Sequence, residues 1–178
     1  MIMGQILQLA RTFGFAKAAI IDMEQVPFDH SFRKYCEENL CRQYNANYSC
    51  PPVCGSPEAM ERRLRVYKKA LVVQTLWDIT DYHDHTAIHR AKASHNIAML
   101  GLISNMRRGG HNGVMCGASC CTLCNACEMA KGHPCVKPDQ KFSCMSAYCI
   151  YVRKLAEQCG MEYDCKDGKL TLFGLYAF

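Results

Sequence analysis

The chain has 178 residues, which is enough for one ordinary domain with its own core and too few for two comfortable ones, so we expect a single domain over residues 1–178. Hydrophobic residues make up 49% and charged residues 21%, as in soluble globular proteins, and no apolar run reaches the roughly eighteen residues that a membrane span needs. The net charge of +5 is modest and does not call for a nucleic-acid partner.

The N-terminal segment MIMGQILQLARTFGF is predicted to form a helix and not an export signal. Gln5 and Arg11 interrupt its apolar residues, no basic segment precedes them, and Ile2, Ile6 and Leu9 recur at helical spacing. We therefore expect the protein in the cytoplasm. Reductants keep thiols reduced there, so the fourteen cysteines are expected to include metal ligands more than disulfides.

The rest of the chain alternates predicted strands with predicted helices. Ser56 is a good N-cap and Pro57 suits the first helical position, so a helix is expected from about residue 58 to 69. The other expected elements are strands over 18–21, 70–77 and 114–118, helices over 84–108 and 143–160, and a terminal hairpin turning at Asp167–Gly168. This alternation predicts the α/β class, with a small mixed sheet, helices and two cysteine-rich metal-binding loops.

The stretch CGASCCTLCNACEMAKGHPC, residues 116–135, contains six cysteines. Cys121, Cys124 and Cys127 have CxxCxxC spacing, and Cys135 follows after a proline. A cubane cluster needs four thiolates that converge on one point, and consecutive CxxC steps supply three of them from one tight loop. We therefore predict a [4Fe–4S] cluster held by Cys121, Cys124, Cys127 and Cys135.

Two other interpretations also fit this stretch, a zinc site and a radical S-adenosylmethionine motif. Zinc can occupy any Cys₄ site, although zinc ribbons usually separate two CxxC pairs by about fifteen to twenty residues. Cys120, Cys124 and Cys127 also fit the CxxxCxxC signature associated with radical S-adenosylmethionine enzymes. That reading is disfavoured, because only 51 residues follow Cys127 and Ala126 stands where those enzymes usually have an aromatic residue.

An earlier block, CEENLCRQYNANYSCPPVCG, offers Cys36, Cys41, Cys50 and Cys54 as ligands of a second cluster. The spacing is looser, but two prolines and a glycine stiffen the turn beside two of the thiols. These thiols could instead complete the first site, form a redox pair or belong to a structural loop. Two [4Fe–4S] sites would lower the net charge from +5 to about +1, since each cluster with four thiolates carries about −2.

The remaining cysteines have no motif of their own. Cys159 and Cys165 flank a predicted helix end and strand, where a buried thiol is the simplest interpretation. Cys116 and Cys120 lie beside the predicted cluster loop, so either could ligate in place of one of its members.

Two further motifs have simple interpretations. In DYHDHTAIH, His85 and His89 lie one helical turn apart and could share a metal, but an N-cap region with solvated histidines is favoured, since no further ligand signature is visible. In ERRLRVYKK the basic residues fit a solvated helix face, with an acidic redox partner or nucleic acid as alternatives.

Four segments together, CRQYNANYSCPPVCG, CTLCNACEMAKGHPC, SAYCIYV and LTLFGLYAF, resemble a bacterial and archaeal family of small, cysteine-rich proteins described as predicted metal-binding proteins. In that family the first block has a Tyr-Gly-x-x-Trp-x-Cys-Pro-Pro pattern and the second a CxLCxxC form with a later Pro-Cys. Asn45 and Tyr48 replace the commoner Gly and Trp, and Cys149 stands where Gly is common. The resemblance implies metal binding and implies no particular reaction.

The function expected from the sequence is that of an iron–sulfur protein, acting as an electron relay or in cluster-supported redox chemistry. Such a protein would work with a redox partner protein, with no nucleic acid and no membrane. Two alternatives remain open: a structural zinc module for protein interactions, or an enzyme with an open-site [4Fe–4S] cluster acting on a sulfur-containing or small organic substrate. The sequence does not decide whether the protein is an enzyme, nor its oligomeric state.

Overall fold

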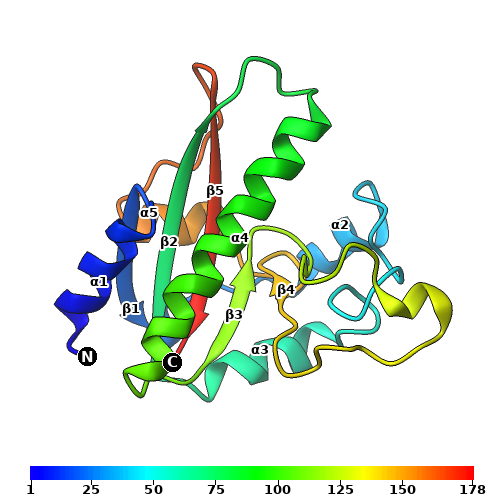
Figure 1. The fold of residues 1–178 in the computed structure, drawn as a ribbon, viewed down its shortest axis with the longest axis horizontal. Coiled ribbons are helices and arrows are strands. Elements are labelled where there is room, and N and C mark those ends of the chain that lie inside the picture. Colours follow the sequence, from blue (N-terminus) through cyan, green and yellow to red (C-terminus); the bar gives the residue numbers. More distant parts are fainter.

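A five-stranded mixed sheet forms the centre of the protein, whose computed structural model describes residues 1–178 (Figure 1). The strand order is β1-β2-β5-β3-β4, and every neighbouring pair is antiparallel except β3 and β4, which are parallel. The strands are β1 (Lys17–Asp22), β2 (Lys69–Asp78), β3 (Val114–Gly117), β4 (Ser143–Cys144) and β5 (Lys169–Ala177). The expected α/β class and mixed sheet are confirmed.

Helices cover both faces of this sheet. They are α1 (Met3–Thr12), α2 (Arg33–Glu37), α3 (Pro57–Arg65), α4 (His85–Arg108) and α5 (Val152–Gln158), with short 3₁₀ turns η1 (Met23–Gln25), η2 (His30–Phe32) and η3 (Glu128–Lys131). On one face, Ile6 of α1 and Leu102 of α4 pack with Leu71 of β2. On the other, Leu64 of α3 and Leu155 of α5 pack with Val72 of β2.

The run ALVVQTLW forms β2 because a strand with helices on both sides buries both of its faces. Alternate residues therefore enter different cores, and Leu71 and Val73 lie opposite Val72. The cap predicted for α3 is present: Ser56 Oγ accepts a hydrogen bond from the Ala59 amide at 3.2 Å, and Pro57 is the first helical residue. Local signals and burial agree in this part of the chain.

The C-terminal third departs from the expected elements. The helix expected over 143–160 is shorter, because residues 143–150 form β4 and turns, and only Val152–Gln158 is helical. The predicted terminal hairpin is wrong, since no strand precedes the turn at Asp167–Gly168. Instead β5 lies between β2 and β3, and its residues from Leu170 to Ala177 are all buried. Burial on both faces outweighs pairing with the adjacent segment.

The cysteine-rich segments lie together beyond the β3–β4 end of the sheet (Figure 1). We call residues 36–55 and 118–144 the cysteine region, and the sheet with α1, α3, α4 and α5 the framework. Three hydrogen bonds join the two segments: the Cys121 amide donates to Ser49 Oγ at 3.0 Å, Tyr48 Oη donates to the His133 carbonyl at 2.7 Å, and Cys120 Sγ donates to Gln43 Oε1 at 3.6 Å. None of the helices combines the length and the apolar composition needed to cross a bilayer.

Candidate metal centre

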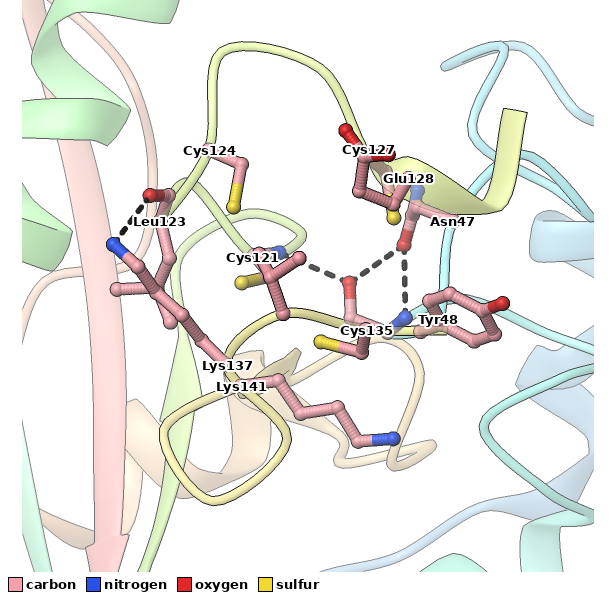
Figure 2. A pocket seen from close by; sticks show the side chains of 12 residues that line it. Asn47, Tyr48, Cys121, Leu123, Cys124, Cys127, Glu128, Cys135, Lys137 and Lys141 are labelled. Carbon is pink, nitrogen blue, oxygen red and sulfur yellow. Dashed lines mark hydrogen bonds between the residues drawn. The ribbon is translucent and has the colours of Figure 1, made fainter. Parts of the chain in front are cut away.

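Four thiols predicted as ligands line one pocket in the cysteine region (Figure 2). Cys121, Cys124 and Cys127 come from the loop after β3, and Cys135 comes from the segment after η3. We call these four the first thiol group. The other lining residues are Asn47, Tyr48, Ser49, Leu123, Glu128, Val136, Lys137 and Lys141.

The backbone of the loop turns back on itself to bring Cys135 to this pocket. Gly132 closes η3 with φ 73°, a left-handed conformation that favours glycine, and its amide donates to the Met129 carbonyl. The His133 amide then donates to the Glu128 carbonyl at 3.1 Å. This turn brings Cys135 to the pocket that the CxxCxxC segment also lines.

Polar groups of the pocket are arranged around the Cys121 thiol. Burial raises the pKa of Cys121, while hydrogen bonds from the backbone amides of Leu123 and Phe142 lower it, and charges on Cys124 and Cys135 raise it. Amide donors of this kind stabilise a thiolate, which is the form that binds metal. For Cys121, burial outweighs these donors, so the pKa of the thiol is raised on balance.

Positive charge also lies beside the first thiol group. Lys137 Nζ donates to the Leu123 carbonyl at 3.1 Å, and Lys141 Nζ lies 5.7 Å from the centre of the Tyr48 ring. Glu128, the acid of the pocket, is neutralised by Lys131 at 2.8 Å and faces His133 at 3.1 Å. The balance of charge at the pocket thus favours a group with net negative charge.

The four cysteines of the earlier block differ in exposure but lie within range of one another's charge. Charges on Cys41 and Cys50 raise the pKa of Cys36, and a charge on Cys50 raises the pKa of Cys54. Cys41 is exposed, and Cys54 is 4% exposed within the apolar core beside Met60. Burial raises the pKa of Cys54, and the charge of Arg33 lowers it.

Cys50 faces Cys120, a residue for which the sequence offered no definite role. Hydrogen bonds to the Cys50 thiolate from Cys120, Asn47 and Ser49 hold the pKa of Cys50 below its usual range, although burial opposes them. The same contact, together with burial, raises the pKa of Cys120. Cys120 and Cys121 are consecutive, yet Cys121 lines the first pocket and Cys120 contacts Cys50.

Cys144 of β4 completes this neighbourhood, and the sequence gave no local motif for it. Burial raises the pKa of Cys144 to about 12, the Ala147 amide donates to its sulfur at 3.4 Å and lowers it, and charges on Cys50 and Cys36 raise it further. The signal that could have found Cys144 is the pairing of β3 with β4, which places Cys144 opposite Gly117 and next to the cluster loop. That pairing is not visible in the sequence.

The other thiols have structural surroundings. Cys116 is fully buried in the core, and burial raises its pKa well above the usual range. Burial likewise raises the pKa of Cys159 to about 11, and Cys165 Sγ lies 3.6 Å from Thr171 Oγ1. All fourteen cysteines are free thiols, and as placed no three His, Cys, Asp or Glu side chains form a group that could hold a single metal ion.

The two motifs with simple interpretations have structural roles. Asp84 caps α4 by accepting from the Ala87 amide at 2.9 Å, and His85 and His89 are exposed. In the basic stretch, Arg65 donates to the Met23 carbonyl at 2.6 Å and to Glu61 at 2.9 Å. Both stretches therefore contribute caps and packing contacts.

An α/β framework that carries a thiol-lined pocket at one end of its sheet defines a cysteine-rich protein suited to binding metal. The family model described as "Predicted metal-binding protein (DUF2284)" matches residues 19–176, and the chain belongs to that family. Searches of curated proteins and of solved structures gave no match.

Two departures from the expected family pattern have a conformational explanation. Asn45 and Cys149, which stand where glycine is common, have φ values of 54° and 55°. Glycine adopts this left-handed region at no steric cost, and asparagine tolerates it better than most residues. Asn45 and Cys149 thus hold a backbone conformation that glycine adopts without strain.

The residues present fit a thiolate-bound metal centre. Four thiols share one pocket, two backbone amides donate to one of them, and lysines lie at its rim.

Proposed function

We propose that this protein binds a [4Fe–4S] cluster through Cys121, Cys124, Cys127 and Cys135 and acts as an electron relay or in cluster-supported redox chemistry. The observation that carries the proposal is the gathering of these four thiols around one pocket from two separate stretches of the loop. Bound there, such a cluster would supply a one-electron redox couple.

The protein's own groups would hold and tune the centre. Hydrogen bonds from the amides of Leu123 and Phe142 lower the pKa of Cys121, although burial raises it on balance, and donors to ligand sulfur stabilise negative charge there. Ser49 fixes the amide of Cys121 from the neighbouring segment at 3.0 Å, which limits movement of this ligand. Lys137 and Lys141 supply positive charge at the rim of the pocket.

We further propose that the protein works in the cytoplasm with a redox partner protein. Reductants in that compartment keep thiols available as metal ligands. Cys124 is exposed, so the first thiol group lies near the surface, where a partner could approach. Neither nucleic acid nor a membrane is part of this proposal.

The test is anaerobic purification of the chain, followed by counts of iron, sulfide and zinc and by electron paramagnetic resonance after reduction. The Cys124→Ala variant should lose about four iron and four sulfide per chain relative to the unmodified protein. Cys165→Ala is the matched control, since Cys165 is also exposed but contacts Thr171, and it should retain the full count.

Zinc without sulfide in the unmodified protein would overturn the iron–sulfur proposal in favour of a structural zinc module. Equal iron loss in Cys124→Ala and Cys165→Ala would show that the pocket is not the site. A resonance spectrum that changes on adding small thiols or organic acids would identify an open coordination position and hence an enzyme.

A further inference from the structure

A second group of thiols gathers behind the first, from four separate segments. Cys36 belongs to α2, Cys50 to the loop before α3, Cys120 to the loop after β3 and Cys144 to β4. Cys120 Sγ donates to Gln43 Oε1 at 3.6 Å, in the loop that leads to Cys50, and the Cys120 thiol lowers the pKa of Cys50. We call these four residues the second thiol group.

The turn at residues 144–147 connects the other two members. Cys36 Sγ lies 3.9 Å from the Ser146 carbonyl oxygen, and Cys144 Sγ accepts from the Ala147 amide at 3.4 Å. Cys144 is also near enough to Cys36, Cys50 and Cys120 for their charges to interact. The four sulfurs are therefore neighbours, although they come from widely separated parts of the chain.

This grouping differs from the one that sequence spacing predicts. Cys54 Sγ is directed to the carbonyl of its neighbour Gly55 at 4.0 Å and is buried among apolar side chains. Cys41 is exposed. The second thiol group has Cys120 and Cys144 in place of Cys41 and Cys54.

Arg33 provides an independent observation. Its side chain is 8% exposed, its Nη1 and Nη2 donate to the carbonyls of Gly55 and Ala147 at 3.1 and 2.9 Å, and its Nε has no hydrogen-bond partner. None of the ion pairs of the chain includes it. A buried cation without a counter-charge is costly, so a negative charge beside it would be stabilised.

The neighbours of Arg33 show where that charge would lie. Cys36 is near enough for the charge of Arg33 to lower the pKa of its thiol, although burial raises it to about 11 overall. The Ala147 carbonyl that binds Arg33 belongs to the same turn whose amide donates to Cys144. The guanidinium thus borders Cys36 of the second thiol group. It also lies beside the Cys54 and Cys149 thiols, and its hydrogen bonds lower the pKa of both.

We propose that Cys36, Cys50, Cys120 and Cys144 hold a second [4Fe–4S] cluster, with Arg33 as its buried counter-charge. Four thiolates on a [4Fe–4S]²⁺ core carry about −2 in total, which matches a site bordered by an unpaired cation. This inference extends the iron–sulfur function proposed above to a second site and rests on the same thiol chemistry.

The test removes the first site and then compares ligand sets at the second. A Cys124→Ala/Cys127→Ala chain, reconstituted anaerobically with iron and sulfide, should retain about four iron and four sulfide. Adding Cys120→Ala or Cys144→Ala should remove them. Adding Cys41→Ala or Cys54→Ala, the matched controls, should not, and circular dichroism checks that each variant is folded.

The opposite pattern, with loss in Cys41→Ala and Cys54→Ala and retention in Cys120→Ala and Cys144→Ala, would overturn the proposed ligand set. Four iron in the unmodified protein that vanish completely in Cys124→Ala/Cys127→Ala would overturn the second site and leave the first intact. If the double variant and the unmodified protein contain the same amount of iron, the iron is bound at the second site. That result would support the second site and overturn the first.

The role of Arg33 has its own measurement. In the Cys124→Ala/Cys127→Ala background, Arg33→Gln should lower the midpoint potential of the remaining cluster in an anaerobic redox titration, because a positive charge favours the more negative reduced state. Arg33→Lys should restore the potential in part, whereas Arg62→Gln, an exposed control on α3, should leave it unchanged. An unchanged potential in a folded, iron-loaded Arg33→Gln chain would remove Arg33 from the proposal.

Discussion

The framework and the cysteine region are built on different physical principles. In the framework, side chains such as Leu102, Leu155 and Leu175 are completely removed from water by packing between sheet and helices. From residue 118 to 141, by contrast, no side chain is buried, and the loop is held by turns and a few polar contacts. Apolar burial stabilises the first region and cannot account for the order of the second.

The contrast indicates what each region needs from outside the polypeptide. The framework can fold from its own sequence, because its cores are closed on both faces of the sheet. A loop with little apolar burial usually depends on a metal or a disulfide, and every cysteine here is a free thiol. The two regions should therefore respond differently to mutation, acid and loss of polar contacts.

The largest effect is expected from a cavity in the framework. Leu102→Ala should lower the free energy of unfolding by about 2–5 kcal/mol, because Leu102 is fully buried between α4 and the sheet. Urea unfolding followed by circular dichroism measures it. Leu40→Ala in the cysteine region is the control and should stay within about 0.5 kcal/mol, since Leu40 is 85% exposed. Similar losses in the two variants would break the comparison.

Acid should weaken the framework through one histidine. Burial lowers the pKa of His95 from 6.5 to about 4, and the ring Nδ1 is bonded to Thr75 Oγ1 at 2.7 Å. The unfolded chain binds a proton at higher pH than the folded one, so this stabilisation is present above pH 6.5 and is lost as the pH falls towards 4. The shift corresponds to about 3 kcal/mol, given 1.36 kcal/mol per pKa unit.

Urea midpoints measured between pH 7 and pH 4 test this effect. His95→Gln should flatten the pH dependence, whatever its effect on stability at neutral pH. His89→Gln, on the exposed side of the same helix, should leave the slope as it is. A slope that survives in His95→Gln would assign the acid sensitivity to another group.

The smallest effect is expected from a polar contact in the cysteine region. Ser49 Oγ accepts from the Cys121 amide and donates to Asn47 Oδ1 at 2.7 Å. Ser49→Ala leaves the Cys121 amide without its acceptor at a local cost of about 1–3 kcal/mol, while Asn47 Oδ1 still accepts from the Ser49 amide. Hydrogen exchange at the Cys121 amide should become faster, while protection in β2 and β5 is unchanged. Thr122→Ala, an exposed change in the same loop, is the control; equal exchange in the two variants would contradict the role of Ser49.

The framework could be predicted wherever local chemistry and burial coincide. Ser56 and Pro57 mark the start of α3, and the apolar run after it is long enough for only one buried strand. The structure of the C-terminal segment is less predictable from the sequence. The turn at Asp167–Gly168 resembles a hairpin turn, although β5 pairs with two distant strands. Local turn residues report conformation, and they do not report which strand becomes the partner.

The two thiol groups also differ in how far the sequence predicts them. CxxCxxC spacing singles out Cys121, Cys124 and Cys127, which the structure places around one pocket with Cys135. That these four bind metal remains a prediction, as does every ligand of the second site. The contact between Cys50 and Cys120, by contrast, depends on how two loops dock, and no spacing within either loop encodes it.

Cys120 and Cys121 are joined by a single peptide bond, yet they face different thiol groups. Filling either site would fix the backbone that carries a ligand of the other, so the entropy cost of ordering that segment would fall on the first metal centre alone. The consequence is cooperative loading: chains carrying both centres or none should dominate over half-filled ones in native mass spectra of a partly reconstituted sample. Independent filling of the two sites would show instead that this shared segment is already ordered without metal.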